Sequence, residues 1–373
     1  MKLIDKIFIW LSMCDLDFGA LYSLFSTYEN PEDMWALDKY EGKIVYQLSG
    51  REFRDLMDVR HSGLLDKVIA ELDSGSKIKY VCMYQDEYPD KLRELDYPPF
   101  VLYYVGDWSL INGRNVGIVG SRVCTRYGRE QTERFARELC NAGFTIVSGL
   151  SEGIDAVAHE TSVKNNGKTI AVVANGLKMI YPAINTNLAR DIAKSGGLLV
   201  TEFYPDYVPK SFAFVRRNRI IAALCEGVLV TEARRDSGAL HTVNFATDLS
   251  REVFALPGNC NSTASQGTND LIKHFGSTCV TEPQEIVDRL NDQVALCELI
   301  NQNQRPISRV DRTMNLREEE SSVLEIVRDE DAHLDEIAKI LNFDTKKLLG
   351  LLTLMEIRGL IKKLPGNFYA RKD

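Results

Sequence analysis

Between residues 80 and 290, short β-branched runs alternate with amphipathic stretches, and this alternation limits the possible folds more than any other feature of the chain. The runs are Val116–Val119, Phe144–Val147, Thr169–Val173, Leu198–Thr201, Val228–Thr231 and Val253–Leu256. The helical stretches between them are Arg129–Ala142, Ile154–Asn165, Thr186–Ser195 and Leu240–Leu249. Strands that alternate with helices predict an α/β fold with an extended Rossmann-like, doubly wound parallel sheet.

The remaining residues predict two flanking domains and a linker. Residues 1–75 show helical periodicity and predict a small helical domain in front of a core at 76–291. Residues 292–317 are polar and irregular, which is typical of a linker. Residues 318–373 contain three predicted helices, Glu318–Arg328, Leu334–Leu341 and Thr345–Ile357, followed by a hairpin, which is the order of a winged helix. Because winged helices bind either DNA or proteins, this order alone decides no function.

Charge and cysteine content exclude several classes of protein. The formal net charge of −8 argues against a globally basic nucleic-acid coat, so any DNA site must be a local patch. The eight cysteines are scattered without a C-x-x-C pair, so we expect reduced thiols and neither a metal nor a cofactor. Asp15 and Asp17 interrupt the N-terminal apolar stretch, so we expect no signal peptide, no membrane span and a cytoplasmic protein.

Small and hydrogen-bonding residues follow four of the predicted strands. They are Gly120, Ser121 and Arg122, then Ser148 and Gly149, then Asn175, and finally Ser237 and Gly238. Carboxyl ends of parallel strands meet at one edge of a sheet, so these residues predict one polar groove that binds phosphate. Glycine permits close backbone approach, hydroxyls and amides donate to phosphate, and a guanidinium matches its oxygens. A tight strand-to-helix turn is the competing explanation for any one of these motifs.

Residues 210–219, between Leu198–Thr201 and Val228–Thr231, concentrate positive charge beside aromatic rings. The segment holds Lys210, Phe212, Phe214, Arg216, Arg217, Asn218 and Arg219, and no acidic residue. We interpret it as a loop that binds single-stranded DNA, in which the arginines neutralise phosphates and Phe214 stacks on a base. Core packing is the alternative for both phenylalanines.

Two enzyme classes have partial motifs in the chain. Gly149-Leu-Ser151-Glu-Gly153 has the spacing of a hydrolase nucleophile elbow, but His159, His241 and His274 lie in predicted helices that place them poorly for a triad. The stretch from Gly117 to Arg122 lacks the G-x-G-x-x-G pattern of dinucleotide binding. We therefore expect no catalytic residues and no enzymatic activity.

With these motifs in place, residues 80–290 resemble the DNA-processing protein A family (DprA, also called Smf). The resemblance rests on 116–122 (VGIVGSR), Tyr127-Gly128, 147–155 (VSGLSEGID), Ala158-His159, Tyr181-Pro182, 217–221 (RNRII), Glu232-Ala233, Ser237-Gly238, 252–258 (EVFALPG) and 267–272 (GTNDLI). It implies a mediator that protects incoming single-stranded DNA in natural transformation and loads the recombinase RecA. It also implies a sterile-alpha-motif-like N-terminal domain, a dimerising Rossmann core and a winged-helix tail.

The chain departs from the family pattern at three positions, where Ser151 replaces alanine, Val215 replaces proline and Ser250 replaces glycine. These changes concern local backbone geometry and leave the phosphate-facing groups intact. One alternative function is a nucleotide-processing enzyme of the lysine-decarboxylase-like phosphoribohydrolase type, although residues 257–263 lack the second glycine and the glutamate of the PGGxGTxxE pattern. Another is an interaction platform in phage defence.

The resemblance also locates a candidate dimer interface near the helix predicted at residues 268–275. The candidate residues are Asn269, Leu271, Ile272 and Phe275. We expect Leu271 and Ile272 to face a second copy of the chain across a symmetric contact. The alternative is that both side chains pack inward.

Overall fold

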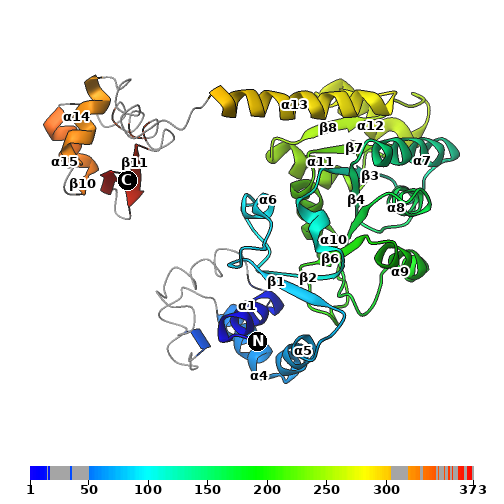
Figure 1. Ribbon diagram of the computed structural model, residues 1–373, viewed down its shortest axis with the longest axis horizontal. Helices are drawn as coiled ribbons and strands as arrows, with labels where there is room; N and C mark the ends of the chain where they lie inside the picture. Colours follow the sequence, from blue (N-terminus) through cyan, green and yellow to red (C-terminus); the bar gives the residue numbers. More distant parts are fainter. Residues whose placement is uncertain are drawn as a thin grey trace. The chain divides into compact units, whose positions relative to one another are not determined.

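The computed structural model describes residues 1–14, 16, 34–35, 50–303, 318–327, 331–341, 343, 348, 352, 355, 360–364 and 368–371. The chain forms two compact units, Met1–Gln293 and Val294–Asp373 (Figure 1). Each unit has a hydrophobic core of its own.

A nine-stranded sheet with the order β1-β2-β6-β5-β4-β3-β7-β8-β9 forms the centre of the first unit. Its parallel strands are β3 (Asn115–Val119), β4 (Thr145–Ser148), β5 (Thr169–Val172), β6 (Leu198–Thr201), β7 (Gly227–Val230), β8 (Glu252–Ala255) and β9 (Thr278–Cys279). Strands β1 (Lys79–Cys82) and β2 (Val101–Gly106) extend it in antiparallel fashion, and β2 pairs with β6. The predicted doubly wound parallel sheet is thus confirmed, whereas β1, β2 and β9 escaped the sequence analysis.

Helices cover both faces of this sheet (Figure 1). One layer contains α7 (Arg126–Asn141), α8 (Ile154–Lys164), α9 (Thr186–Lys194) and the start of α13 (Pro283–Asn303); the other contains α10 (Ser211–Leu224), α11 (Ala239–Asp248) and α12 (Gln266–His274). Successive strand residues face opposite layers, so Ile118 and Leu229 pack with α7 while Val119 and Val230 pack with α10 and α11. Shorter helical segments are α6 (Asp90–Arg93), Trp108–Asn112, Ala183–Asn185 and Thr263–Ser265.

The cationic segment at 210–219 is helical, so its interpretation as a loop is wrong. Helix α10 begins at Ser211, after Lys210 in an extended conformation, and contains neither proline nor glycine. Its second half, from Arg217 to Leu224, is buried throughout. A helix buried on all sides shows no amphipathic period, and for this reason the pattern did not reveal it.

The N-terminal helices are α1 (Leu3–Met13), α4 (Gly50–His61) and α5 (Leu64–Asp73). They share one hydrophobic core with β1 and β2, in which Ile7 and Trp10 pack with Val101 and Tyr103. The core therefore continues across the boundary expected at residue 75, and the N-terminal domain as a separate unit stays a prediction.

The predicted linker begins too early. Helix α13 continues to Asn303, so residues 292–303 are helical rather than irregular. Residues 304–317 lie outside the described part of the chain.

The second unit contains α14 (Glu318–Ile326), α15 (Leu334–Leu341) and a three-stranded sheet ordered β10-β12-β11. Its strands are β10 (Ala332–His333), β11 (Ile361–Leu364) and β12 (Phe368–Arg371). The first two predicted helices and the closing hairpin are present in winged-helix order. The helix predicted at Thr345–Ile357 lies outside the described residues, apart from isolated positions.

Candidate nucleic-acid interface

The strand order of the sheet has its switch point at β3: β4, β5 and β6 follow on one side of β3, and β7 and β8 follow on the other. Ligands of doubly wound sheets bind at such switch points, beyond the carboxyl ends of the strands. A cavity of about 540 Å³ lies there. Its lining includes the predicted site residues Gly120, Ser121, Arg122, Phe214, Arg217, Asn218, Ser237 and Gly238.

Close backbone contacts shape one wall of this cavity. The Ser121 amide donates to the Glu232 carbonyl at 2.7 Å, and the Ile154 amide donates to the Ser121 carbonyl at 3.1 Å. Gly153, at the start of α8, has a φ of 75°, and a Cβ there would lie 2.3 Å from the Ser121 carbonyl oxygen. Only glycine fits this position. Because Gly153 has no side chain, the N-terminus of α8 can approach the loop that carries Arg122 and hydrogen-bond to it.

Arg122 and Phe214 lie together at the rim of the cavity. The Arg122 side chain is exposed, and its guanidinium carbon lies 5.3 Å from the centre of the Phe214 ring. Phe214 itself is half-buried, because it packs against a cluster formed by Ala174, Phe203 and Ala213. Base stacking by Phe214 stays a prediction, and its surroundings are partly those of a core residue.

Arg217 lies inside the protein, with 3% of its surface exposed. Its guanidinium donates to the Gly149 carbonyl at 2.6 Å and to the Val172 carbonyl, and so joins the carboxyl ends of β4 and β5. Burial lowers the pKa of Arg217 to about 10, while the buried carboxylate of Asp155 opposes that shift. Phosphate neutralisation by Arg217 is untested, and the observed contacts are those of a residue that holds the strand ends.

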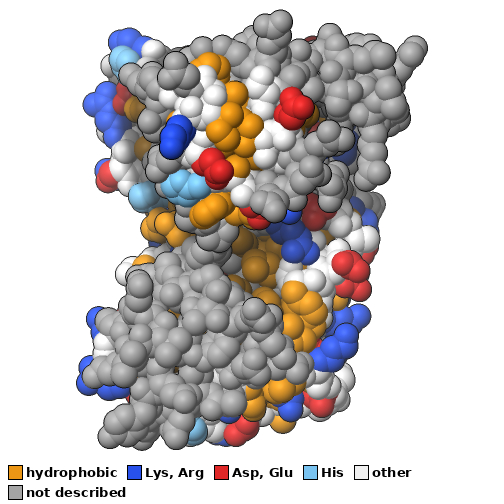
Figure 2. Space-filling view, turned by 90° about the vertical axis from the view of Figure 1, so that its left-hand side faces the viewer, with side chains coloured by type: hydrophobic (Ala, Val, Ile, Leu, Met, Phe, Trp, Pro, Cys, Tyr) orange, Lys and Arg blue, Asp and Glu red, His pale blue; other side chains and the backbone are white. Residues whose placement is uncertain are grey.

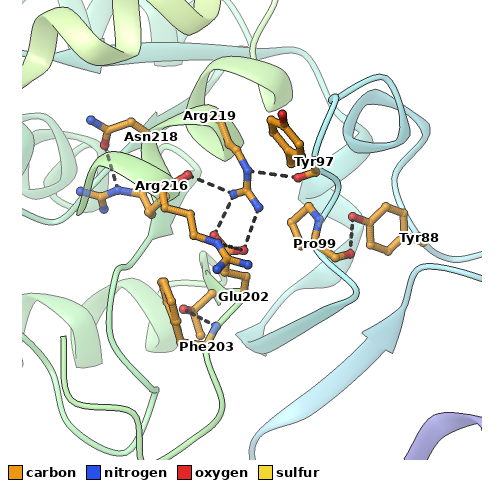
Figure 3. A network of polar contacts seen from close by, with 10 residues as sticks. Tyr88, Tyr97, Pro99, Glu202, Phe203, Arg216, Asn218 and Arg219 are labelled. Atoms are coloured by element: carbon orange, nitrogen blue, oxygen red, sulfur yellow. Dashed lines mark hydrogen bonds and ion pairs between the residues drawn. The ribbon is translucent and has the colours of Figure 1, made fainter. Parts of the chain in front are cut away.

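Arg219 is also buried, at 6% exposure, and forms the centre of the polar network in Figure 3. Its two terminal nitrogens donate to the two Glu202 carboxylate oxygens at 2.7 Å each, and Nε donates to the Tyr97 carbonyl at 3.1 Å. Arg216 donates to the same carboxylate at 3.1 Å and keeps 39% of its side chain exposed. Burial alone would raise the pKa of Glu202, but Arg219 and then Arg216 outweigh it and hold the pKa below its usual value. The cations of residues 210–219 therefore differ: Lys210 and part of Arg216 are exposed, while Arg217 and Arg219 are buried and bonded within the protein. Contact of any of them with DNA stays a prediction.

Three predicted site residues lie behind the cavity rather than in its lining. The Ser148 hydroxyl donates to the Ile118 carbonyl at 2.6 Å, and the Asn175 side-chain amide donates to the Met179 carbonyl at 2.6 Å. Gly149 lies directly against the Arg217 guanidinium. The structure gives all three a place in the support of the strand ends, and their contact with DNA stays a prediction.

The sequence analysis missed two residues near the cavity. Asp155 lines it and is 7% exposed. The Tyr181 ring lies 5.6 Å from the Phe214 ring and is 49% exposed. Both residues occur in the strings that carry the family resemblance, but nothing in their spacing pointed to the cavity.

The Gly149–Gly153 segment lacks the geometry of a nucleophile elbow. That motif places the nucleophile at the strained position of the turn, whereas here the positive φ of 56° falls on Leu150 rather than on Ser151. His159 is fully buried and its Nδ1 pairs with the Thr169 hydroxyl at 2.7 Å. Burial lowers the pKa of His159 to about 3. A buried imidazole that faces Thr169 cannot serve as the base for Ser151.

The candidate dimer residues on α12 have different environments. Leu271 is 5% exposed and packs in the sheet core, so the expectation that it faces a second copy is wrong; the helix uses its apolar face to cover its own sheet. Ile272 is half-buried against the same core, and both side-chain amide atoms of Asn269 bond to Gly258 at 3.0 Å. Phe275 is 73% exposed.

Charged side chains of both signs occur together on one face of the molecule. On the face shown in Figure 2, lysine and arginine side chains lie beside aspartate and glutamate side chains.

Within the described ranges, no group of His, Cys, Asp and Glu could hold a metal ion. The described helices include none that is long and apolar enough to cross a membrane.

The fold is a doubly wound sheet with a cavity at its switch point, the place where α/β proteins of this kind bind their ligands, and the cavity lining includes the exposed Arg122. The sequence matches the family DNA recombination-mediator protein A over residues 79–291 and the DprA winged helix domain over residues 309–367. The chain belongs to this family of DNA-processing proteins.

Relatives and solved structures agree with this assignment. Protein Smf of Escherichia coli is 37% identical over 280 residues, which are 75% of this chain and 74% of that protein. The X-ray structure of DNA processing protein A from Streptococcus pneumoniae is 33% identical, covers 73% of this chain and 98% of its own, and gives a TM-score of 0.58. A Helicobacter pylori structure, whose subject is the single-stranded DNA binding mode of DNA processing protein A, is 31% identical, covers 57% of this chain and 96% of its own, and gives a TM-score of 0.52.

Proposed function

We propose that this protein binds single-stranded DNA in the cytoplasm as a non-catalytic recombination mediator that protects incoming DNA and loads RecA during natural transformation. The observation that carries the DNA-binding part is the exposed Arg122 guanidinium and the Phe214 ring at the rim of the cavity. The Helicobacter pylori relative supports the choice of single strands. RecA as partner and transformation as the process rest on the family resemblance alone.

Titration of labelled oligonucleotides at several salt concentrations tests this function. We expect tight binding of single strands, weak binding of the matching duplex, and an affinity that falls steeply with salt, because phosphate contacts release counterions. Saturable binding of a mononucleotide, with its hydrolysis and no affinity for oligonucleotides, would support the phosphoribohydrolase alternative instead. Stimulation of RecA filament formation on the bound strand then tests the loading role.

The absence of hydrolase activity is a separate prediction. Ser151 lines the cavity, and its backbone amide donates to Asp155 at 3.3 Å while its carbonyl accepts from Asn185 at 3.2 Å. Ser151→Ala keeps both backbone contacts, so we expect little change in DNA affinity or in the unfolding midpoint. The measurement is turnover of esters and nucleotides by both proteins. Turnover that the wild type shows and the Ser151→Ala protein lacks would contradict the non-catalytic proposal.

Homodimer formation is proposed through the end of α12, where Phe275 is exposed. An isologous contact presents each substitution twice, so Phe275→Glu should raise the dimer dissociation constant at least about tenfold and leave the fold intact. Light scattering over a concentration series measures this. Lys273→Glu, two residues earlier and also exposed, controls for charge. A monomeric wild type at micromolar concentration, or an unchanged constant in Phe275→Glu, would remove this surface from consideration.

A further inference from the structure

Two aromatic rings from different crossovers of the sheet lie side by side next to the cavity: Phe214 lines it, and Tyr181 contacts Phe214. Phe214 comes from the first turns of α10, and Tyr181 comes from the segment between β5 and α9. Their centroids lie 5.6 Å apart with an interplanar angle of 59°. Two segments that are distant in sequence thus place their rings side by side at the same edge of the sheet.

The two rings differ in what surrounds them. Phe214 packs on the Ala174 and Phe203 cluster, has the Arg122 guanidinium over its ring at 5.3 Å, and has Tyr181 beside it. Phe214 is therefore only partly exposed, although it lines the cavity. Tyr181 is 49% exposed, although an aromatic ring of this size is usually more buried.

We propose that Tyr181, rather than Phe214, provides the surface on which an unpaired nucleobase stacks, and that Phe214 positions the Tyr181 ring. This inference rests on the proposed single-stranded DNA function. A nucleotide has a flat apolar face joined to a negative phosphate. Around Phe214 the protein offers a matching pair, the exposed Tyr181 ring at 5.6 Å and the exposed Arg122 guanidinium at 5.3 Å. Stacking on aromatic rings is common in single-strand sites because every base has such a face.

The competing occupant of an exposed tyrosine is another protein chain. The neighbouring Arg122, which lines the cavity, favours a nucleotide, because a guanidinium is a donor that matches phosphate oxygens. Two measurements distinguish these occupants. A protein contact at Tyr181 would make the oligomeric mass of the protein change in Tyr181→Ala, whereas a nucleotide contact makes the affinity depend on the presence of bases in the oligonucleotide.

Affinity for a labelled oligothymidine, measured by fluorescence anisotropy, gives the first result. Tyr181→Ala should weaken binding about tenfold, whereas Tyr181→Phe and Tyr181→Trp should stay within about twofold of the wild type. The slope of affinity against salt should not change, because no charge is removed. Ile184→Ala is the matched control: Ile184 is 77% exposed and close in the same connection, but has no ring, so its loss should have no effect.

An oligonucleotide of abasic residues separates stacking from a structural role. With no base present, wild type and Tyr181→Ala should bind equally, and any remaining difference would mean that Tyr181 acts through the fold. If the wild type binds DNA but Tyr181→Ala binds thymidine strands equally well, the stacking inference fails while the DNA function survives. If the wild type binds no single strand, the proposed function itself fails. A change of oligomeric mass in Tyr181→Ala would assign the ring to a protein contact and overturn the proposal.

Discussion

Replacing Glu202 with Gln should lower the free energy of unfolding of the first unit by about 3–5 kcal/mol. The Glu202 carboxylate is 3% exposed and accepts both terminal nitrogens of Arg219, whose side chain is 7% exposed. Without the carboxylate, a buried guanidinium keeps its charge but loses its counterion. The glutamine has the same shape, so the loss measures charge compensation rather than packing.

Tryptophan fluorescence in a denaturant titration measures this effect in the first unit alone, because the three tryptophans of the chain, Trp10, Trp35 and Trp108, precede residue 294. The double variant Glu202→Gln with Arg219→Met should recover part of the loss, since a buried ion pair can be replaced by apolar groups. Glu130→Gln, which removes the exposed partner of Arg126, should leave the midpoint unchanged. A loss below about 1 kcal/mol in Glu202→Gln would show that water reaches Arg219.

The pH dependence of the same variant has a definite sign. Because the pKa of Glu202 is depressed in the folded protein, its contribution is complete above the unfolded value of about 4.3 and is lost as the pH falls through the folded value. The difference between wild type and Glu202→Gln should therefore be largest near neutral pH and narrow in acid.

The sequence predicted the parallel strands well because each is a short apolar run bounded by small residues, as at Val116–Val119 before Gly120. It did not predict α10, because the arginines in the middle of the helix and the burial of its second half hide the helical period. It missed β1 and β2 because they pair with each other and with β6 at the antiparallel end of the sheet, where no crossover helix marks them.

The candidate site was predictable only in part. Residues at strand exits reach the cavity because the topology brings the carboxyl ends together, so Gly120, Ser121 and Arg122 were accessible to sequence reasoning. The burial of Arg217 and Arg219 could not be predicted from the sequence. A run of arginines looks the same in a sequence whether its guanidinium groups bind phosphates or a buried carboxylate. The deciding partner of Arg219, Glu202, lies 17 residues earlier in the chain, on the other side of an intervening loop.

Replacing Arg122 with Glu should weaken single-stranded DNA binding about a hundredfold at low salt, because one phosphate contact is lost and a repulsive charge takes its place. The slope of log affinity against log salt should become shallower by at least about 0.7, the value for one single-strand phosphate. Arg122→Lys should keep the slope, because the charge remains, and lose part of the affinity, because an ammonium lacks the planar, two-pronged donor set that a guanidinium offers to phosphate. Anisotropy titrations across a salt series give both quantities.

The control for this prediction is Arg126→Glu, four residues further along the chain at the start of α7. Arg126 has 91% of its side chain exposed, forms a surface pair with Glu130 and does not belong to the cavity lining. In a chain with a net charge of −8, any added negative charge repels DNA at long range, and this contribution is the same for both variants. Only a phosphate held at the cavity rim makes Arg122→Glu markedly worse than Arg126→Glu. If both variants lose the same amount of DNA affinity, the loss comes from the overall charge of the protein, and the cavity is not the DNA site.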